Sequence, residues 1–127
     1  MKSLPRPTDS ELAILQVLWE NGPSTVRLVN EKLNLVRDVG YTTTLKLMQI
    51  MAEKGLVSRN TDSRTHIYAA ALSEREAQRN LLDKFVDTAF RGSAVKLVMQ
   101  ALGNHQTSKE ELEAIKALIE AKEKDNK

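Results

Sequence analysis

The 127-residue chain contains no cysteine, only two histidines and few aromatic residues, which make up 4% of it. The absence of cysteine excludes disulfides, thiolate metal sites and thiol nucleophiles. His66 and His105 lie far apart without metal-ligand spacing, and there is no glycine-rich phosphate loop or paired-carboxylate motif. Ser24, Ser73 and Ser108 each precede a helical pattern, so we interpret them as N-caps. The sequence therefore indicates a protein that is not an enzyme and uses no cofactor or metal.

Long hydrophobic runs are also absent. The longest apolar stretches span only a few residues, far fewer than a membrane-spanning helix needs. The first residues, MKSLPRPTDSE, lack the apolar segment of a secretory signal. With 41% apolar and 28% charged residues, the composition is typical of a globular protein. We therefore expect a soluble, cytoplasmic protein.

Neither sign of charge dominates, because 19 lysines and arginines balance 17 aspartates and glutamates, giving a net charge of +2. A protein that coats DNA through charge alone needs a much larger excess of positive charge. Any binding of nucleic acid must therefore come from a local arrangement of hydrogen-bond donors and cations.

Two short helices are expected near the start of the chain. Thr8 and Glu11 have the spacing of a capping box and open the first helix, which the sequence Asn21-Gly22-Pro23 ends. Ser24 is the expected N-cap of a second helix, which ends near Asn34. The apolar stripe of the first helix consists of Leu12, Leu15, Leu18 and Trp19, with Ile14 on its flank.

A third helix and a β-hairpin follow a short connector. The third helix is expected from Tyr41 to Lys54, with polar side chains on one face and apolar side chains on the other. Two β-prone runs, at 56–59 and 64–70, flank a polar turn, which is typical of a hairpin. The order of three helices and a hairpin predicts a winged helix-turn-helix domain over residues 1–72.

Residues 73–127 are expected to form three more helices, which gives a mainly α protein. Capping boxes begin at Ser73 and Ser108, and Gly92 and the Gly103-Asn104 pair end the first two helices. Three short helices bury too little apolar area to fold alone, so we expect this region to form a homodimer; packing onto the first domain is the alternative. The expected dimerisation residues are Leu81, Phe85, Phe90, Val98, Leu112, Ile115, Leu118 and Ile119.

The third helix and the hairpin carry the candidate DNA-binding residues. In a winged helix the third helix lies in the major groove of DNA, and the hairpin, or wing, reaches the backbone beside it. Hydroxyl, amide and cationic groups there can bind phosphates and base edges. The predicted residues are Thr42, Thr43, Lys46, Gln49, Arg59, Arg64 and Thr65. The alternatives are an ordinary solvated helix face, or a winged helix that binds another protein, which the near-neutral charge favours.

Short motifs along nearly the whole chain resemble those of one family. In chain order, the motifs are Leu12-Ala13-Ile14-Leu15, Leu18-Trp19, Thr25-Val26-Arg27, Tyr41-Thr42-Thr43-Thr44, Lys54-Gly55-Leu56-Val57 and the run from Arg64 to Tyr68. Together they are similar to the three helices and the wing of the BlaI/MecI/CopY repressors, of the penicillinase repressor type. These repressors control β-lactamase, methicillin-resistance and copper-export genes in bacteria.

The resemblance implies a homodimer that binds a palindromic operator as double-stranded DNA and represses transcription, with Thr42, Thr43 and Lys46 touching the DNA. Repressors of the β-lactam branch are inactivated by a membrane-bound sensor protease, whose cut corresponds here to Gln100–Ala101. The family's cut favours an asparagine before an aromatic residue, which this pair is not. The copper branch needs a cysteine-rich tail, so copper sensing of that type is excluded. A repressor released by a small ligand is a further alternative, and it would need a pocket between the domains.

Overall fold

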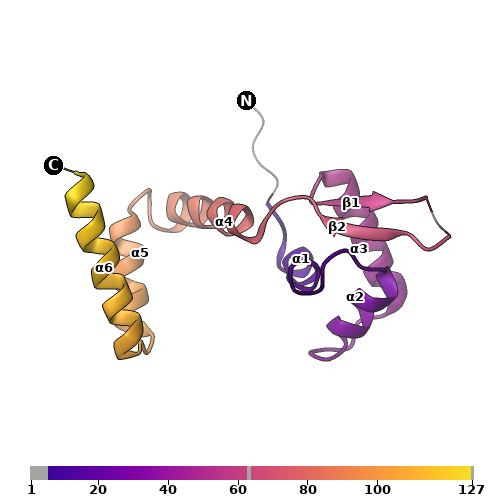
Figure 1. Ribbon diagram of the computed structural model, residues 1–127, viewed down its shortest axis with the longest axis horizontal. Coiled ribbons are helices and arrows are strands. Elements are labelled where there is room, and N and C mark those ends of the chain that lie inside the picture. The colour runs from indigo at the N-terminus through magenta and orange to yellow at the C-terminus, as the bar shows by residue number, and fades with distance from the viewer. Residues whose placement is uncertain (1–5, 63, 127) are drawn as a thin grey trace. The chain divides into compact units, whose positions relative to one another are not determined.

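The computed structural model describes residues 6–62 and 64–126. Within these ranges the chain forms six α-helices and one antiparallel hairpin (Figure 1). In chain order the elements are α1 (Asp9–Asn21), α2 (Val26–Leu33), α3 (Tyr41–Lys54), β1 (Val57–Asn60), β2 (Ile67–Ala70), α4 (Glu74–Ala89), α5 (Ala94–Asn104) and α6 (Lys109–Asp125). The predicted order of three helices, a hairpin and three further helices is confirmed.

The chain divides into two compact units, the first ending at Lys84 and the second beginning at Phe85. Both residues belong to α4. The first unit therefore holds α1, α2, α3, the hairpin and most of α4, whereas the second holds the end of α4 with α5 and α6. The division of function at residue 72 stays a prediction.

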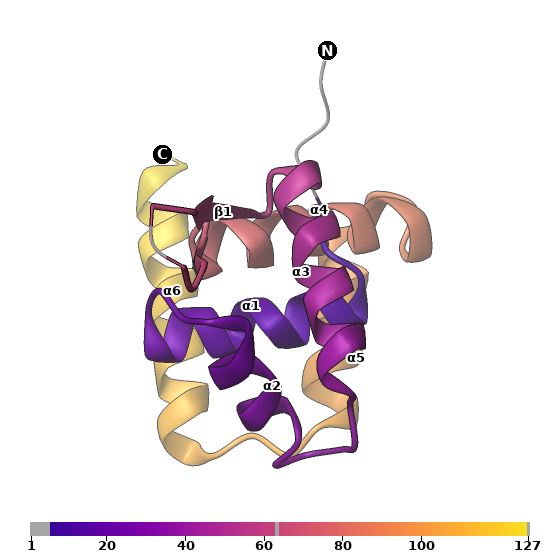
Figure 2. The same ribbon diagram turned by 90° about the vertical axis from the view of Figure 1, so that its right-hand side faces the viewer.

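In the first unit, α1, α2 and α3 pack into one cluster with the hairpin at its edge (Figure 2). Helix α1 begins with the predicted capping box: the Thr8 amide donates to Glu11 Oε1 over 2.9 Å, and the Glu11 amide donates to Thr8 Oγ1 over 3.2 Å. The predicted stripe of α1 was wrong in one respect. Ile14, expected on the flank, is fully buried, whereas Leu12 is half-buried, because α2, α3 and β2 all pack against α1.

The start of α2 also differs from the prediction. Thr25, not Ser24, is the N-cap, since Thr25 Oγ1 accepts a hydrogen bond from the Leu28 amide over 3.1 Å. The backbone of Ser24 instead exchanges two 2.8 Å hydrogen bonds with Tyr68 of β2. Ser24 thereby adds a one-residue bridge beside the hairpin, and its hydroxyl donates to the carbonyl of Gly22 over 2.7 Å. This pairing fixes the hairpin against the start of α2.

The core of the first unit lies between the three helices and the hairpin. Its buried apolar residues are Ile14, Leu15, Leu18, Val26, Val29, Met48, Met51, Leu56, Val57 and Tyr68. Full burial of each large side chain contributes on the order of 1.5–3 kcal/mol to folding, so this core is the main source of the unit's stability. In addition, the indole N–H of Trp19 donates to the Leu72 carbonyl over 3.0 Å and ties α1 to the segment before α4.

The second unit has no comparable core. No described residue from Phe85 onward is buried, and α5 and α6 contain no buried side chain. Side-chain caps nevertheless open both helices, from Ser93 on α5 and from the predicted capping box of Ser108 and Glu111 on α6. The predicted end of α5 was wrong: the helix continues through Gly103 to Asn104, because Gly103 keeps an ordinary negative φ and leaves the helical pattern unbroken.

Candidate nucleic-acid interface

The exposed face of α3 presents four of the predicted DNA-binding residues. Thr42, Thr43, Lys46 and Gln49 are all exposed and lie at the spacing of one helix face. The opposite face contributes Thr44, Met48 and Met51 to the interior. Burial of one face thus orients the other face, with its hydroxyl, ammonium and amide groups, toward solvent.

The α2–α3 connector positions α3 through a network of amide side chains. Asn30 Nδ2 donates to the Val39 carbonyl and to Thr44 Oγ1, each over 2.9 Å. Asn34 forms reciprocal bonds with the backbone of Val39: Nδ2 donates to the carbonyl over 2.9 Å, and the Val39 amide donates to Oδ1 over 3.1 Å. These bonds link the end of α2 to the first turn of α3, so they set the direction of α3.

A salt bridge holds the other end of α3. Lys54 Nζ lies 2.7 Å and 3.0 Å from the two carboxylate oxygens of Glu11, whose side chain is only 3% exposed. Burial raises the pKa of Glu11, but the hydrogen bonds and charge of Lys54 and the hydrogen bonds of Thr8 lower it more strongly. The pKa of Glu11 therefore lies below its ordinary value, and the ion pair joins the first turn of α1 to the last turn of α3.

The wing residues lie beside α3 in two hollows. One hollow of about 410 Å³ is bordered by Gln49 of α3 and Arg59 of β1. A second hollow of about 260 Å³ is bordered by Tyr41 of α3 and by Arg64 and Thr65 of the wing. The structure thus brings each of the three predicted hairpin residues next to α3. Lys46, Thr42 and Thr43 border neither hollow.

The sequence prediction missed two residues of this surface. Tyr41, which opens α3, is 51% exposed and lines the second hollow together with His66. Ile50 is 37% exposed and lies four residues after Lys46, and hence on the same helix face. The helical spacing of Ile50 from Thr43 and Lys46 could have indicated that Ile50 belongs to this surface. Its apolar character obscured that signal, because an isoleucine on a helix is usually assigned to the core.

The predicted dimerisation residues are mostly exposed. The exposed ones are Phe85, Val98, Leu112, Leu118 and Ile119, with exposed fractions from 41% to 61%. Leu81, Phe90 and Ile115 are half-buried. Val95, Met99 and Leu102, which were not predicted, extend the stripe on α5, with exposed fractions of 72%, 67% and 38%. Together with Val98 they occupy the i, i+3, i+4 and i+7 positions of one helix face, and this spacing could have identified them.

The expected cleavage position lies on α5. Gln100 and Ala101 are both exposed and helical. The backbone between them is therefore accessible from solvent but held in the helix, so a protease can cut it only after a local opening of α5.

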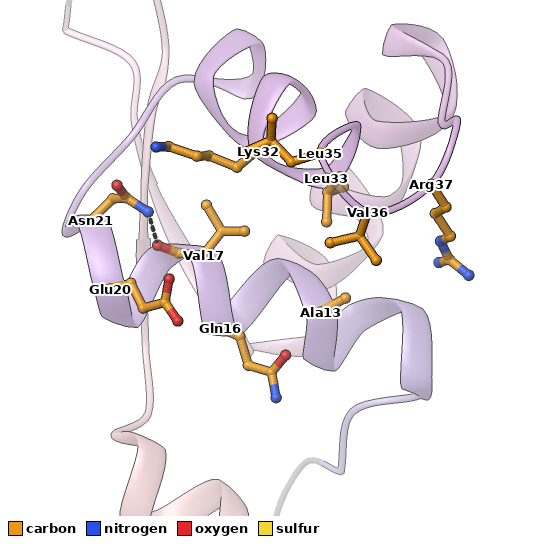
Figure 3. Close-up of a pocket in the computed structure, with 10 residues that line it drawn as sticks. All are labelled: Ala13, Gln16, Val17, Glu20, Asn21, Lys32, Leu33, Leu35, Val36 and Arg37. Atoms are coloured by element: carbon orange, nitrogen blue, oxygen red, sulfur yellow. Dashed lines mark hydrogen bonds between the residues drawn. The ribbon is translucent and has the colours of Figure 1, made fainter.

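A further pocket, of about 420 Å³, lies within the first unit, between α1 and the turn after α2 (Figure 3). Leu33 and Val36 line it from the α2 side, and Ala13 and Val17 line it from α1. Val36 is 88% exposed, and five polar or charged side chains contribute to the lining, so the pocket is an open groove of mixed character. It is not the pocket between domains that a ligand-released repressor was expected to need.

Within residues 6–62 and 64–126, no three histidine, aspartate or glutamate side chains gather closely enough to hold a metal ion. Among the same residues, no helix combines the length and the apolar character needed to span a membrane.

Comparison with known proteins places the chain in a family. The family model described as "Penicillinase repressor" matches residues 7–121. The "Transcriptional regulator BlaI" of Mycobacterium tuberculosis is 39% identical over 83 residues, which are 65% of this chain and only 60% of that relative's length. The penicillinase repressor of Bacillus licheniformis is 22% identical over 120 residues, 94% of each chain.

A solved structure shares the fold of the first unit. The solution structure of B. licheniformis BlaI in its monomeric form, in complex with the blaP half-operator, is similar to this chain at a TM-score of 0.51 and 21% identity. The similarity covers 60% of this chain and 93% of that one. It confirms the predicted winged helix fold. Because the family model spans most of its length, the chain belongs to the penicillinase repressor family.

Proposed function

We propose that this protein is a transcriptional repressor that binds a palindromic operator as a homodimer in the cytoplasm. The observation that carries the proposal is the exposed polar face of α3 beside the wing cations Arg59 and Arg64. A relative of the same fold was solved with a DNA half-operator, which supports this role for the surface.

Each part of the surface has a suitable role on DNA. Thr42, Thr43 and Gln49 offer hydroxyl and amide groups, and threonine methyls, to base edges in the major groove. Lys46, Arg59 and Arg64 supply cations for phosphates, and Thr65 adds a hydroxyl. Because the net charge of the whole chain is only +2, we expect affinity to depend on these few contacts rather than on a broad positive field.

The dimer is supported by the second unit. The unit exposes apolar side chains on α5 and α6 and buries none among its described residues. Exposed apolar area of this extent is unfavourable in water unless a partner covers it. A second copy also supplies the second reading head that a two-fold operator requires. Linking two weakly binding heads then raises the affinity for the whole operator.

We further propose that cleavage by a membrane-bound sensor protease relieves repression. A cut between Gln100 and Ala101 would detach α6 and the last turn of α5, and with them much of the exposed apolar surface. The dimer would then weaken and release the operator. Mass spectrometry of protein recovered from cells treated with a β-lactam checks this step. A fragment beginning at Ala101 supports it, and a chain that stays intact while repression is lost contradicts it.

The direct test of DNA binding is selection of sheared genomic DNA on the purified full-length protein at moderate salt, followed by sequencing. We expect enrichment of a short palindrome, and the neighbouring genes then identify the regulated pathway. A matched variant with Thr42, Thr43 and Lys46 changed to alanine should enrich nothing. If folded wild-type protein also enriches nothing, the proposal is contradicted, and a winged helix that binds another protein becomes the better interpretation.

A further inference from the structure

An open apolar hollow lies where α5 and α6 meet, in the second unit. Its volume is about 500 Å³. Its apolar lining comes from Ala101 and Leu102 of α5 and from Ala114 and Ile115 of α6. The rest of the lining comes from His105, Gln106, Thr107 and Glu111, and none of the described lining residues is a phenylalanine, tyrosine or tryptophan. A depression of this kind can accept a large apolar side chain from outside.

The second unit also contains a pair of aromatic side chains in contact with each other. The rings of Phe85 and Phe90 meet edge to face, with centroids 5.6 Å apart and planes at 67°. Phe85 is 53% exposed. Residues five apart do not meet on a continuous helix. Phe90 lies directly after the end of α4 at Ala89, and Arg91 and Gly92, which follow it, adopt left-handed φ values of 52° and 84°.

A hydrogen-bonded left-handed turn ends α4. The Gly92 amide donates to the Val86 carbonyl over 2.9 Å, which closes the left-handed turn. Left-handed backbone is unfavourable for a non-glycine residue such as Arg91. The two rings in edge-to-face contact, with Phe85 exposed and Phe90 half-buried, form one aromatic group, which we call the Phe85–Phe90 knob.

We propose that the Phe85–Phe90 knob of one copy inserts into the α5–α6 hollow of a second copy, and that the reciprocal contact forms by two-fold symmetry. This inference rests on the homodimer proposed above and names the contact that forms it. A knob and a hollow on one chain are what a self-complementary interface requires, since each is used twice in a two-fold dimer. The exposed fraction of Phe85 and the lack of any buried side chain among residues 85–126 support a second copy as the occupant.

Charge at the edges of the two features is complementary. Arg91 follows Phe90 directly and is exposed, and no ion pair forms to it within the described residues. Glu111 lines the hollow, where one of its carboxylate oxygens accepts a hydrogen bond from the Ser108 amide over 3.0 Å. Insertion of the knob therefore brings a cation toward a carboxylate at the rim.

Two variants and a control test the proposal by native mass spectrometry of the full chain without DNA. The F85A/F90A variant lacks the knob, and the A114W variant fills the hollow with its own indole. Each alone should dimerise at least about 30-fold more weakly than wild type, because truncating or blocking a central aromatic anchor removes most of the binding energy. Ala117 is exposed on α6 and does not line the hollow, so A117W should dimerise normally.

Mixing the two variants gives the decisive result. The knob of the A114W copy fits the free hollow of the F85A/F90A copy, so we expect a heterodimer that forms more readily than either homodimer. Its mass distinguishes it from both. If F85A/F90A dimerises like wild type, or if the mixture shows no preference for the heterodimer, the inference is overturned while the proposed dimer stands. If wild type itself is monomeric at every concentration, the proposed dimer fails.

Discussion

The side-chain amide of Asn30 on α2 donates a 2.9 Å hydrogen bond to the buried hydroxyl of Thr44 on α3. The same amide nitrogen donates to the Val39 carbonyl in the connector, and the Thr44 hydroxyl donates to the Gly40 carbonyl over 3.3 Å. One short chain of hydrogen bonds thus links the end of α2, the connector and the first turn of α3. The direction of the proposed recognition helix depends on it.

Replacing Asn30 with alanine should lower the free energy of unfolding by about 1–3 kcal/mol, because the connector carbonyl and the buried hydroxyl lose a donor. Urea denaturation followed by the fluorescence of Trp19 measures this change, since the chain has one tryptophan. Asn104 is exposed at the end of α5, so N104A is the matched control and should change stability little. Equal stability of N30A and wild type would show that the network does not hold α3.

The Glu11–Lys54 ion pair should make stability depend on pH. The pKa of Glu11 is lowered in the folded protein, so its contribution is complete above the ordinary value of 4.5 and is lost as pH falls through the folded value. At neutral pH, E11Q should lower the free energy of unfolding by about 1–2 kcal/mol. When the pH is lowered from about 5 to about 3, the melting temperature of E11Q should then fall less than that of wild type.

The exposed pair of Arg27 and Glu31 provides the control for E11Q. Their side chains are 84% and 62% exposed and approach to 3.5 Å, so E31Q should change stability by less than about 0.5 kcal/mol. Thermal unfolding across pH separates the two variants. An E11Q profile parallel to that of wild type would contradict the assigned role of Glu11.

Lys46 is expected to bind a DNA phosphate. The K46A variant should bind the operator more weakly, and the slope of log affinity against log salt should fall by about one unit. Lys32 carries the same charge but lies on α2 beside the groove of Figure 3, so K32A should leave the slope unchanged. Fluorescence anisotropy with labelled operator over a salt series measures both. If K46A and K32A have the same slope as wild type, Lys46 does not contact phosphate.

Helix α3 lacks a side-chain cap, because its N-cap is Gly40. Gly40 has a φ of −70°, and a Cβ atom placed there would meet no atom within 4 Å. G40S should therefore stabilise the protein by about 0.5–1 kcal/mol, through a new cap and a less flexible unfolded chain. At Gly55 the φ is 82°, so G55S should destabilise the protein by about 1 kcal/mol. Opposite signs in urea denaturation are the expected outcome, and destabilisation by G40S would contradict the cap argument.

Much of the fold could be predicted because its signals are local. Each of the three capping boxes depends on residues three apart, and all three form the expected hydrogen bonds. The role of Ser24 could not be predicted, since its backbone pairs with Tyr68, 44 positions later in the chain. The burial of Ile14 likewise depends on the three elements that pack against α1, namely α2, α3 and β2. Tertiary contacts of this kind override local patterns.

The residues of the candidate site could be predicted from the sequence, but which of them lie next to one another could not. The helical spacing of polar and apolar positions predicted the exposed face of α3, and the hairpin pattern predicted the wing. That Arg59 would border a hollow with Gln49, and Arg64 another with Tyr41, depends on how the hairpin and its turn pack beside α3. Similarly, spacing indicated the apolar stripes of the second unit, but the contact of the Phe85 and Phe90 rings depends on the end of α4 at Ala89 and on the side-chain conformations there.

The most direct test of the central claim compares binding of the full-length protein to a whole selected palindrome and to one half-site. Sedimentation velocity with labelled DNA gives the number of protein copies on each. We expect two copies on the palindrome and an affinity at least about 100-fold higher than for the half-site, as expected for two linked reading heads. One copy bound with equal affinity to both DNAs would contradict a dimeric repressor.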